Sequence, residues 1–146
     1  MSAYFDSSIV TKWYLPERDS AAALRVRRRF APPAVLTHLH RVELATAWHV
    51  KVFRKELTQA IVDGALADLA ADIRDGVWEP PRYDLPSVYA RAETLGREYA
   101  AKLGVRTLDI LHVAAALALG ARNFVTNDGR QGRLAAAVGL QVTRVR

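Results

Sequence analysis

The sequence predicts a single α/β domain with three layers, α/β/α, around a mainly parallel sheet. Short strand-like segments alternate with segments of helical periodicity along the whole chain. The connections are short, and strand–helix–strand units of this kind imply parallel strands with right-handed crossovers. No repeat, low-complexity tract or Gly/Ser-rich linker divides residues 1–146. One domain is therefore expected over the whole length.

The first half of the chain should supply three strands and four helices. Pro80 and Pro81 restrict the strand around them to a sheet edge, because proline lacks the N–H that a ladder needs. The expected elements are a strand at Ser2–Phe5, a helical turn ended by Pro16, a helix at Ala21–Phe30, a strand at Ala34–Thr37, a helix at Leu39–Lys55, a helix between Thr58 and Gly76, and an edge strand within Val77–Arg82.

The second half should supply three helices and two strands. Glycines follow the periodic segments, as is typical just beyond helix C-termini. The expected elements are a helix at Pro86–Leu103, a helix capped by Thr107 and ended by Gly120, a strand at Asn123–Thr126, a helix at Arg130–Val138, and a final strand at Leu140–Val145.

Composition excludes several classes of protein. The 146 residues contain no cysteine, which excludes disulfides, thiolate zinc sites and cysteine nucleophiles. The longest apolar run, Val113–Leu119, is too short to span a bilayer, and no signal-peptide pattern opens the chain. We therefore expect a cytoplasmic protein with no membrane association. The net charge of +6 indicates a polyanionic partner such as a nucleic acid.

Four acidic residues break the local patterns. Asp6 and Asp128 follow expected strands, and ligands bind at the carboxyl ends of parallel strands, although both could simply cap helices. Glu43 lies within an apolar helical stripe, where its alternative is a position at the edge of the surface. Asp109 lies in an otherwise apolar helix, where burial is costly unless the charge is paired, although it could instead complement the helix dipole.

Together the four acids predict a cluster at the carboxyl edge of the sheet. Carboxylate oxygens, with no cysteine and no paired-histidine motif, favour a hard cation such as Mg²⁺ or Mn²⁺. Acidic metal ligands within a basic surface are typical of phosphodiester cleavage. Arg27, Arg28 and Arg29 belong to a basic run that could bind RNA phosphates or form a solvated helix face.

Four segments resemble the PIN-domain family in order and spacing, and especially the VapC-type toxins of toxin–antitoxin pairs. The segments are "YFDSSIVTKWYLPE", "VELATAW", "RTLDILHVAAALALGA" and "FVTND". The resemblance implies a PIN-like α/β/α fold and a Mg²⁺- or Mn²⁺-dependent endoribonuclease. It also implies a cognate antitoxin protein and a homodimer as partners.

By motif match, the resemblance implies that Asp6, Glu43, Asp109 and Asp128 are the catalytic and metal-binding residues. It places Ser7 and Thr126 beside these ligands, as contacts to the ligands or to phosphate. Asn127 adjoins the last acid and could contribute an oxygen. His112, one turn after Asp109, could be a general base, but a lone histidine on an apolar helix is usually a buried, hydrogen-bonded core residue.

The sequence departs from the family pattern after the last acid. Gln131 and Gly132 stand where the family usually has an aromatic or large apolar residue. Two other functions stay open: a PIN-type RNA-processing nuclease without an antitoxin, and a catalytically silent module that binds RNA or protein. The four intact acids count against the silent module, because they would repel a bound polyanion.

Overall fold

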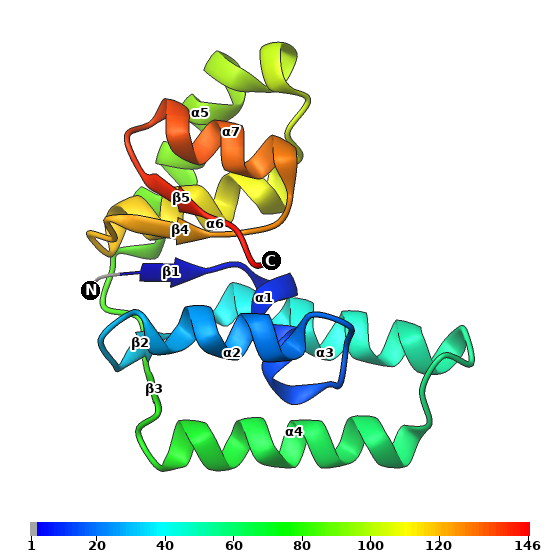
Figure 1. Cartoon of the computed structure of the whole chain (residues 1–146). Helices are drawn as coiled ribbons and strands as arrows, with labels where there is room; N and C mark the ends of the chain where they lie inside the picture. Colours follow the sequence, from blue (N-terminus) through cyan, green and yellow to red (C-terminus); the bar gives the residue numbers. More distant parts are fainter. Residues whose placement is uncertain (1–2) are drawn as a thin grey trace.

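The computed structural model describes residues 3–146, so the predicted strand residue Ser2 lies outside the described residues. Strands and helices alternate as the sequence predicts (Figure 1). In chain order the elements are β1 (Ala3–Phe5), α1 (Ser7–Tyr14), α2 (Ser20–Arg28), β2 (Ala34–Val35), α3 (His38–Phe53), α4 (Gln59–Arg74), β3 (Trp78–Glu79), α5 (Leu85–Leu103), α6 (Thr107–Ala118), β4 (Asn123–Val125), α7 (Gly129–Ala137) and β5 (Gln141–Thr143).

All of the observed strand pairs are parallel, which confirms the predicted sheet type. β1 pairs with β4 and β4 with β5, while β2 pairs with β3 in a separate two-stranded part. β1 lies beside β2 (Figure 1), but within residues 3–146 no backbone hydrogen bond joins these two strands. Among the described residues, β3 pairs with β2 and with no other strand, as expected for the edge strand that precedes Pro80 and Pro81.

Two hydrophobic cores cover opposite faces of the sheet and create the three layers. Along β1, Ala3 and Phe5 pack into the core beneath α1 to α4, whereas Tyr4 packs into the core beneath α5 to α7. This alternation follows from the two-residue side-chain period of a strand. On β4, Phe124 and Val125 divide between the two cores in the same way. Figure 1 shows the two helical layers on either side of β1, β4 and β5.

The helix ends lie within about two residues of the predicted ones, and one predicted cap is wrong. Thr58 caps α4 through its side chain, and Gly104 ends α5 with a positive φ of 66°. The predicted cap at Thr107 is wrong: Thr107 is the first residue of α6, and Arg106 occupies the cap position without a side-chain hydrogen bond. Among residues 3–146 no helix has the length and apolar composition needed to cross a membrane.

Candidate active site

Asp6 begins the site at the point where β1 ends and α1 starts. Its side chain is buried, and Oδ1 accepts hydrogen bonds from the Ser8 N–H at 2.6 Å and the Ile9 N–H at 3.2 Å. These bonds satisfy the free amides of the first helical turn, so Asp6 is the N-cap of α1. Its other oxygen, Oδ2, accepts a hydrogen bond from the Thr126 hydroxyl.

The turn between β4 and α7 places Thr126 and Asp128 beside Asp6. β4 pairs directly with β1, so their carboxyl ends meet at one sheet edge. Asp128 is exposed and caps α7, with Oδ1 accepting from the Gln131 N–H at 2.8 Å. The buried Gln131 side chain also contacts the Thr126 hydroxyl, with Oε1 2.8 Å from Oγ1. Capping therefore holds both strand-end aspartates at this edge.

Glu43 reaches the same region from α3. Its Oε1 atom accepts hydrogen bonds from the Ser7 hydroxyl at 3.0 Å and from Nε2 of His112. Burial would raise the pKa of Glu43, but the hydrogen bonds from His112 and Ser7 outweigh it and hold that pKa below its usual value. Glu43 is therefore ionised, and hydrogen bonds from Ser7 and His112 hold its side chain in place.

Tyr4 determines which nitrogen of His112 carries the bonding proton. The Tyr4 hydroxyl lies 2.6 Å from His112 Nδ1, and burial holds the pKa of Tyr4 well above its usual value. The hydroxyl therefore stays protonated and donates a hydrogen bond to Nδ1. The ring proton is then on Nε2, which donates a hydrogen bond to Glu43. His112 is thus buried and hydrogen-bonded, as expected for a core histidine, but its partner is one of the four predicted acids.

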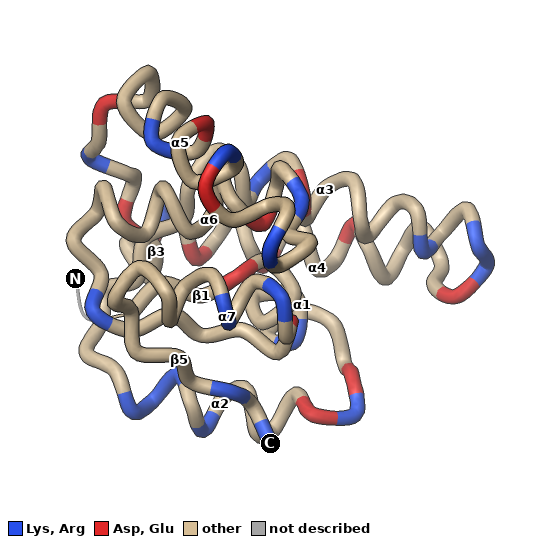
Figure 2. Tube along the Cα trace, turned by 90° about the horizontal axis from the view of Figure 1, so that it is seen from above, with Lys and Arg blue, Asp and Glu red and all other residues tan. Residues whose placement is uncertain are grey.

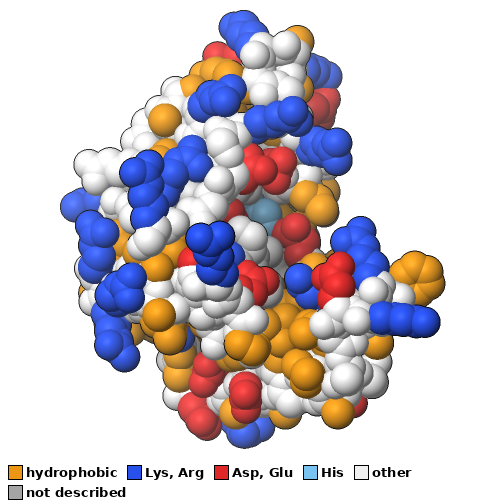
Figure 3. Space-filling view, turned by 45° about the vertical axis from the view of Figure 1, so that its right-hand side comes forward, with side chains coloured by type: hydrophobic (Ala, Val, Ile, Leu, Met, Phe, Trp, Pro, Cys, Tyr) orange, Lys and Arg blue, Asp and Glu red, His pale blue; other side chains and the backbone are white. Residues whose placement is uncertain are grey.

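Asp109 lies in the first turn of α6, and the other three predicted acids affect its pKa. Burial raises its pKa, and the negative charges of Asp128, Asp6 and Glu43 raise it further. The structure thus places Asp109 close enough to the other three predicted acids for their charges to act on it. Figure 3 shows acidic side chains gathered around a hollow in which a histidine lies, with basic side chains on the surrounding surface.

The acids do not form a finished metal site as they stand. Within residues 3–146, no three His, Asp or Glu side chains form a group that could hold a metal ion. The donor set nevertheless fits a hard divalent cation, because all four groups are carboxylates and a cation would relieve the repulsion that Asp109 experiences from the other three. Asp6, Glu43, Asp109 and Asp128 are the residues that could hold it.

The other predicted site residues have different surroundings. Ser7 and Thr126 contact the predicted acids directly. Asn127 instead uses its Oδ1 atom to accept a hydrogen bond from the Val145 N–H at 2.8 Å. Its side-chain oxygen therefore ties down the segment after β5.

The predicted arginines also differ from one another. The Arg27 guanidinium lies over the rings of Trp13 and Trp78, at 4.6 and 5.5 Å from their centroids, whereas Arg28 and Arg29 are exposed. Arg28 and Arg29 thus stay available as phosphate contacts, while Arg27 has a second role in packing.

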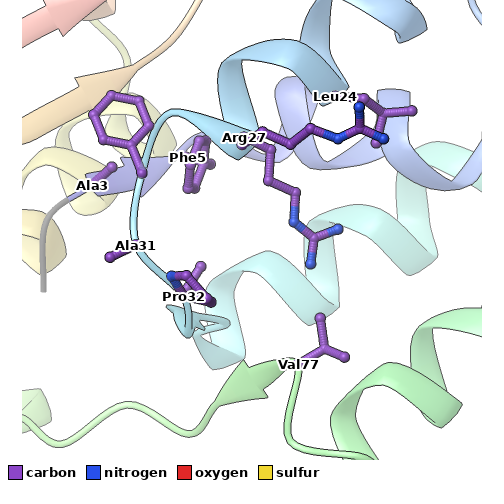
Figure 4. A pocket seen from close by; sticks show the side chains of 10 residues that line it. Ala3, Phe5, Leu24, Arg27, Ala31, Pro32 and Val77 are labelled. Carbon is purple, nitrogen blue, oxygen red and sulfur yellow. The ribbon is translucent and has the colours of Figure 1, made fainter.

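Two hollows lie at opposite ends of the strands. One, of about 270 Å³, is lined by residues that include Ser7 and Glu43, the one predicted acid that borders it. The larger one, of about 440 Å³, is lined by Ala3, Phe5 and Arg27 among others, and lies at the amino ends of the strands (Figure 4). The larger hollow is therefore separate from the acidic site.

Comparison with protein families decides the assignment. The PIN domain profile matches residues 3–137. The chain belongs to the PIN domain family. A search of curated proteins found no match.

Two solved structures share the PIN fold of this chain. VapBC-1 from nontypeable Haemophilus influenzae superposes with a TM-score of 0.66 and 17% identity, over 99% of this chain and 98% of the other. FitAcB from Neisseria gonorrhoeae gives a TM-score of 0.58 and 17% identity, over 97% and 96%. The likeness covers nearly the full length of all three chains, so this PIN domain has the overall fold of these proteins.

His112, Tyr4 and Gln131 are the site residues that sequence reasoning missed as partners of the acids. His112 was visible as the second polar residue of an apolar helix, which was the available signal. Nothing in the sequence connected it with Glu43, which lies 69 positions away. Tyr4 looked like an ordinary apolar strand residue, and Gln131 appeared only as a departure from the family pattern.

Proposed function

We propose that this PIN domain is a metal-dependent endoribonuclease and the toxin of a type II toxin–antitoxin system. The proposal is supported by the placement of the four carboxylates. Asp6 and Asp128 cap the helices that follow β1 and β4, Glu43 is hydrogen-bonded to Ser7 of the helix that Asp6 caps, and the charges of these three acids raise the pKa of Asp109. Such repulsion is costly in a fold without a bound cation, and it is useful in one that binds a cation.

Asp6, Glu43, Asp109 and Asp128 would hold Mg²⁺ or Mn²⁺. When bound, such an ion activates water and neutralises charge that develops on a phosphate. The chain's own hydrogen bonds do the positioning. Ser7 and His112 orient Glu43, and Thr126 orients Asp6. These contacts limit the freedom of two acids before any cation arrives.

The cleavage test compares two acids that differ in position. Asp109→Asn is nearly isosteric and should reduce Mg²⁺-dependent cleavage of RNA by orders of magnitude. Asp68→Asn, at an exposed position on α4, is the matched control and should leave cleavage unchanged. Cleavage that is equal in both variants, or equal with Mg²⁺ and with EDTA, would contradict the proposal.

The antitoxin partner is supported by the sequence motifs and by the likeness to VapBC-1 and FitAcB. Expression of the chain should arrest bacterial growth, and co-expression of the small reading frame beside its gene should relieve the arrest. A chain that cleaves RNA but whose growth effect no neighbouring protein relieves would instead be an RNA-processing nuclease.

A homodimer is supported by an apolar surface on α3 and α5. Val42 is 66% exposed, and Tyr89 and Leu85 are 57% and 47% exposed, around a hollow of about 240 Å³. Exposed apolar clusters of this kind are typical of interfaces. Val42→Glu should convert a dimer to a monomer in light scattering, whereas Ile61→Glu, on the exposed side of α4, should not. A monomeric wild-type chain would refute the homodimer.

A further inference from the structure

Four arginines gather at a further hollow, next to the acidic site. The hollow has a volume of about 590 Å³ and is open to solvent. It lies between the end of α2, the outer side of α7, and β5 with the residues that follow it, and Figure 2 shows basic positions along α2 and around β5. Its basic lining residues, which we call the arginine pocket, are Arg29, Arg133, Arg144 and Arg146.

No Asp or Glu lines the arginine pocket, and within residues 3–146 none of its four arginines forms an ion pair with a carboxylate. Within residues 3–146, the arginines that form ion pairs with a carboxylate are Arg74 and Arg97, both far along the chain from the pocket. Four guanidinium groups with like charge raise the local potential and attract anions. Guanidinium groups also match the geometry of phosphate oxygens, with which they form paired hydrogen bonds.

The pocket shares a wall with the acidic site. A Cβ atom added at Gly132 would lie 3.2 Å from Nη2 of Arg144 and 3.6 Å from Cγ2 of Thr126. The absence of a side chain at Gly132 therefore leaves the space that Arg144 occupies. On the other side of this wall, the Thr126 hydroxyl donates to Asp6. Arg144 also donates from Nη1 to the Asn127 carbonyl at 2.8 Å, which holds it over the turn that carries the last acid.

We propose that the arginine pocket binds backbone phosphates of the RNA strand that is cleaved at the acids, one or more nucleotides away from the scissile bond. The proposal rests on the proposed function for the identity of the strand. The residues that line the pocket include no aromatic side chain on which a base could stack. Contact is therefore with phosphates, and the pocket adds affinity without selecting a sequence.

The test removes two pocket arginines and, separately, two others. Arg29→Ala/Arg133→Ala alters exposed pocket residues and spares Arg144, which has a structural hydrogen bond. Arg91→Ala/Arg122→Ala is the charge-matched control, because both residues are exposed and neither lines the pocket. Binding of a fluorescent single-stranded RNA oligonucleotide is measured in EDTA across a series of salt concentrations, and thermal melts verify that both variants fold.

The pocket variant should bind RNA about tenfold more weakly at ~0.1 M salt than the control variant. Each lost single-strand phosphate contact should lower the slope of log K against log salt by about 0.7, so the pocket variant should lose about 1.4. Arg133→Glu, a second variant, should weaken binding further. Equal affinities and slopes for the pocket and control variants would overturn the proposal, and would be the result if the pocket instead binds an acidic protein segment.

The binding and cleavage readouts separate the two proposals. RNA affinity that depends on the pocket arginines, in a wild-type chain that cleaves no RNA with Mg²⁺ or Mn²⁺, would support the phosphate site and overturn the nuclease. Metal-dependent cleavage by a pocket variant that retains full RNA affinity would support the nuclease and overturn the phosphate site.

Discussion

Replacing His40 with Gln should flatten the pH dependence of the unfolding free energy between pH 8 and pH 5. His40 is fully buried at the start of α3, where Nε2 donates to the Phe5 carbonyl at 2.7 Å and Nδ1 accepts from the Thr37 N–H at 3.1 Å. Both ring nitrogens are thus satisfied in the uncharged form. A second proton would face the Thr37 N–H.

The magnitude follows from the pKa of His40. Burial, with the nearby His112, lowers that pKa from 6.5 to about 3. Below pH 6.5 His40 is protonated in the unfolded chain but stays neutral in the folded chain. The contribution of His40 to the unfolding free energy is therefore full above pH 6.5 and falls as the pH decreases toward 3. At ~1.4 kcal/mol for each pH unit below 6.5, this group should cost about 2 kcal/mol by pH 5.

Urea unfolding at several pH values, in EDTA, measures the effect. His40→Gln should be less stable than wild type by about 1–3 kcal/mol at pH 8, because buried hydrogen bonds are lost, and the gap should narrow by about 2 kcal/mol at pH 5. His38→Gln, at an exposed position two residues earlier, should keep the wild-type pH dependence. Parallel curves for wild type and His40→Gln would refute the reasoning. Titration of the His40 ring by NMR offers a second measurement, in which its signals should stay unshifted down to pH 5.

Three further predictions concern the site and the core. Millimolar Mg²⁺ or Mn²⁺ should raise the melting temperature above its value in EDTA, because the cation binds only the folded cluster of acids; identical midpoints would count against a metal site. Asp109→Asn should raise the melting temperature in EDTA, because it removes a charge whose pKa is raised by burial and by neighbouring acids; a lowered midpoint would indicate that Asp109 mainly stabilises its helix. Trp48→Phe should lower the unfolding free energy by about 2 kcal/mol, because Trp48 is fully buried and donates from Nε1 to Thr11 Oγ1 at 3.0 Å; a loss below about 0.5 kcal/mol in urea unfolding would contradict this.

Local sequence signals predicted the fold well because each element carries its own boundaries. Glycine and proline mark the ends of several helices, and the Pro80–Pro81 pair identified the edge strand. The error at Thr107 arose because a hydroxyl residue can occupy the first helical position as readily as the cap. The missing ladder between β1 and β2 depends on how two distant segments meet, and no local signal reports it.

The sequence predicted the acids of the candidate site and two of the hydroxyl residues that contact them, Ser7 and Thr126. A carboxylate in an apolar helix stands out in sequence, which is why Glu43 and Asp109 could be selected. Their partners could not, because Tyr4 and His112 meet 108 positions apart and only the folded chain joins them. In the same way, Arg27 looked like any other member of its basic run until the structure placed it over Trp13 and Trp78.

Because no backbone hydrogen bond joins β1 to β2 within residues 3–146, His40 helps to fix the position of one strand relative to the other. Asp6 directly follows β1, and β2 leads into the helix that carries Glu43, so the spacing of these two acids depends on how the strands align. Neighbouring strands normally keep their alignment through a ladder, whereas here the His40 imidazole bonds to the last carbonyl of β1. This interior side chain therefore contributes to the spacing of the two acids, together with the hydrogen bond from Ser7 to Glu43. A substitution at His40 should therefore change the spacing of Asp6 and Glu43 while leaving all four predicted carboxylates in the chain.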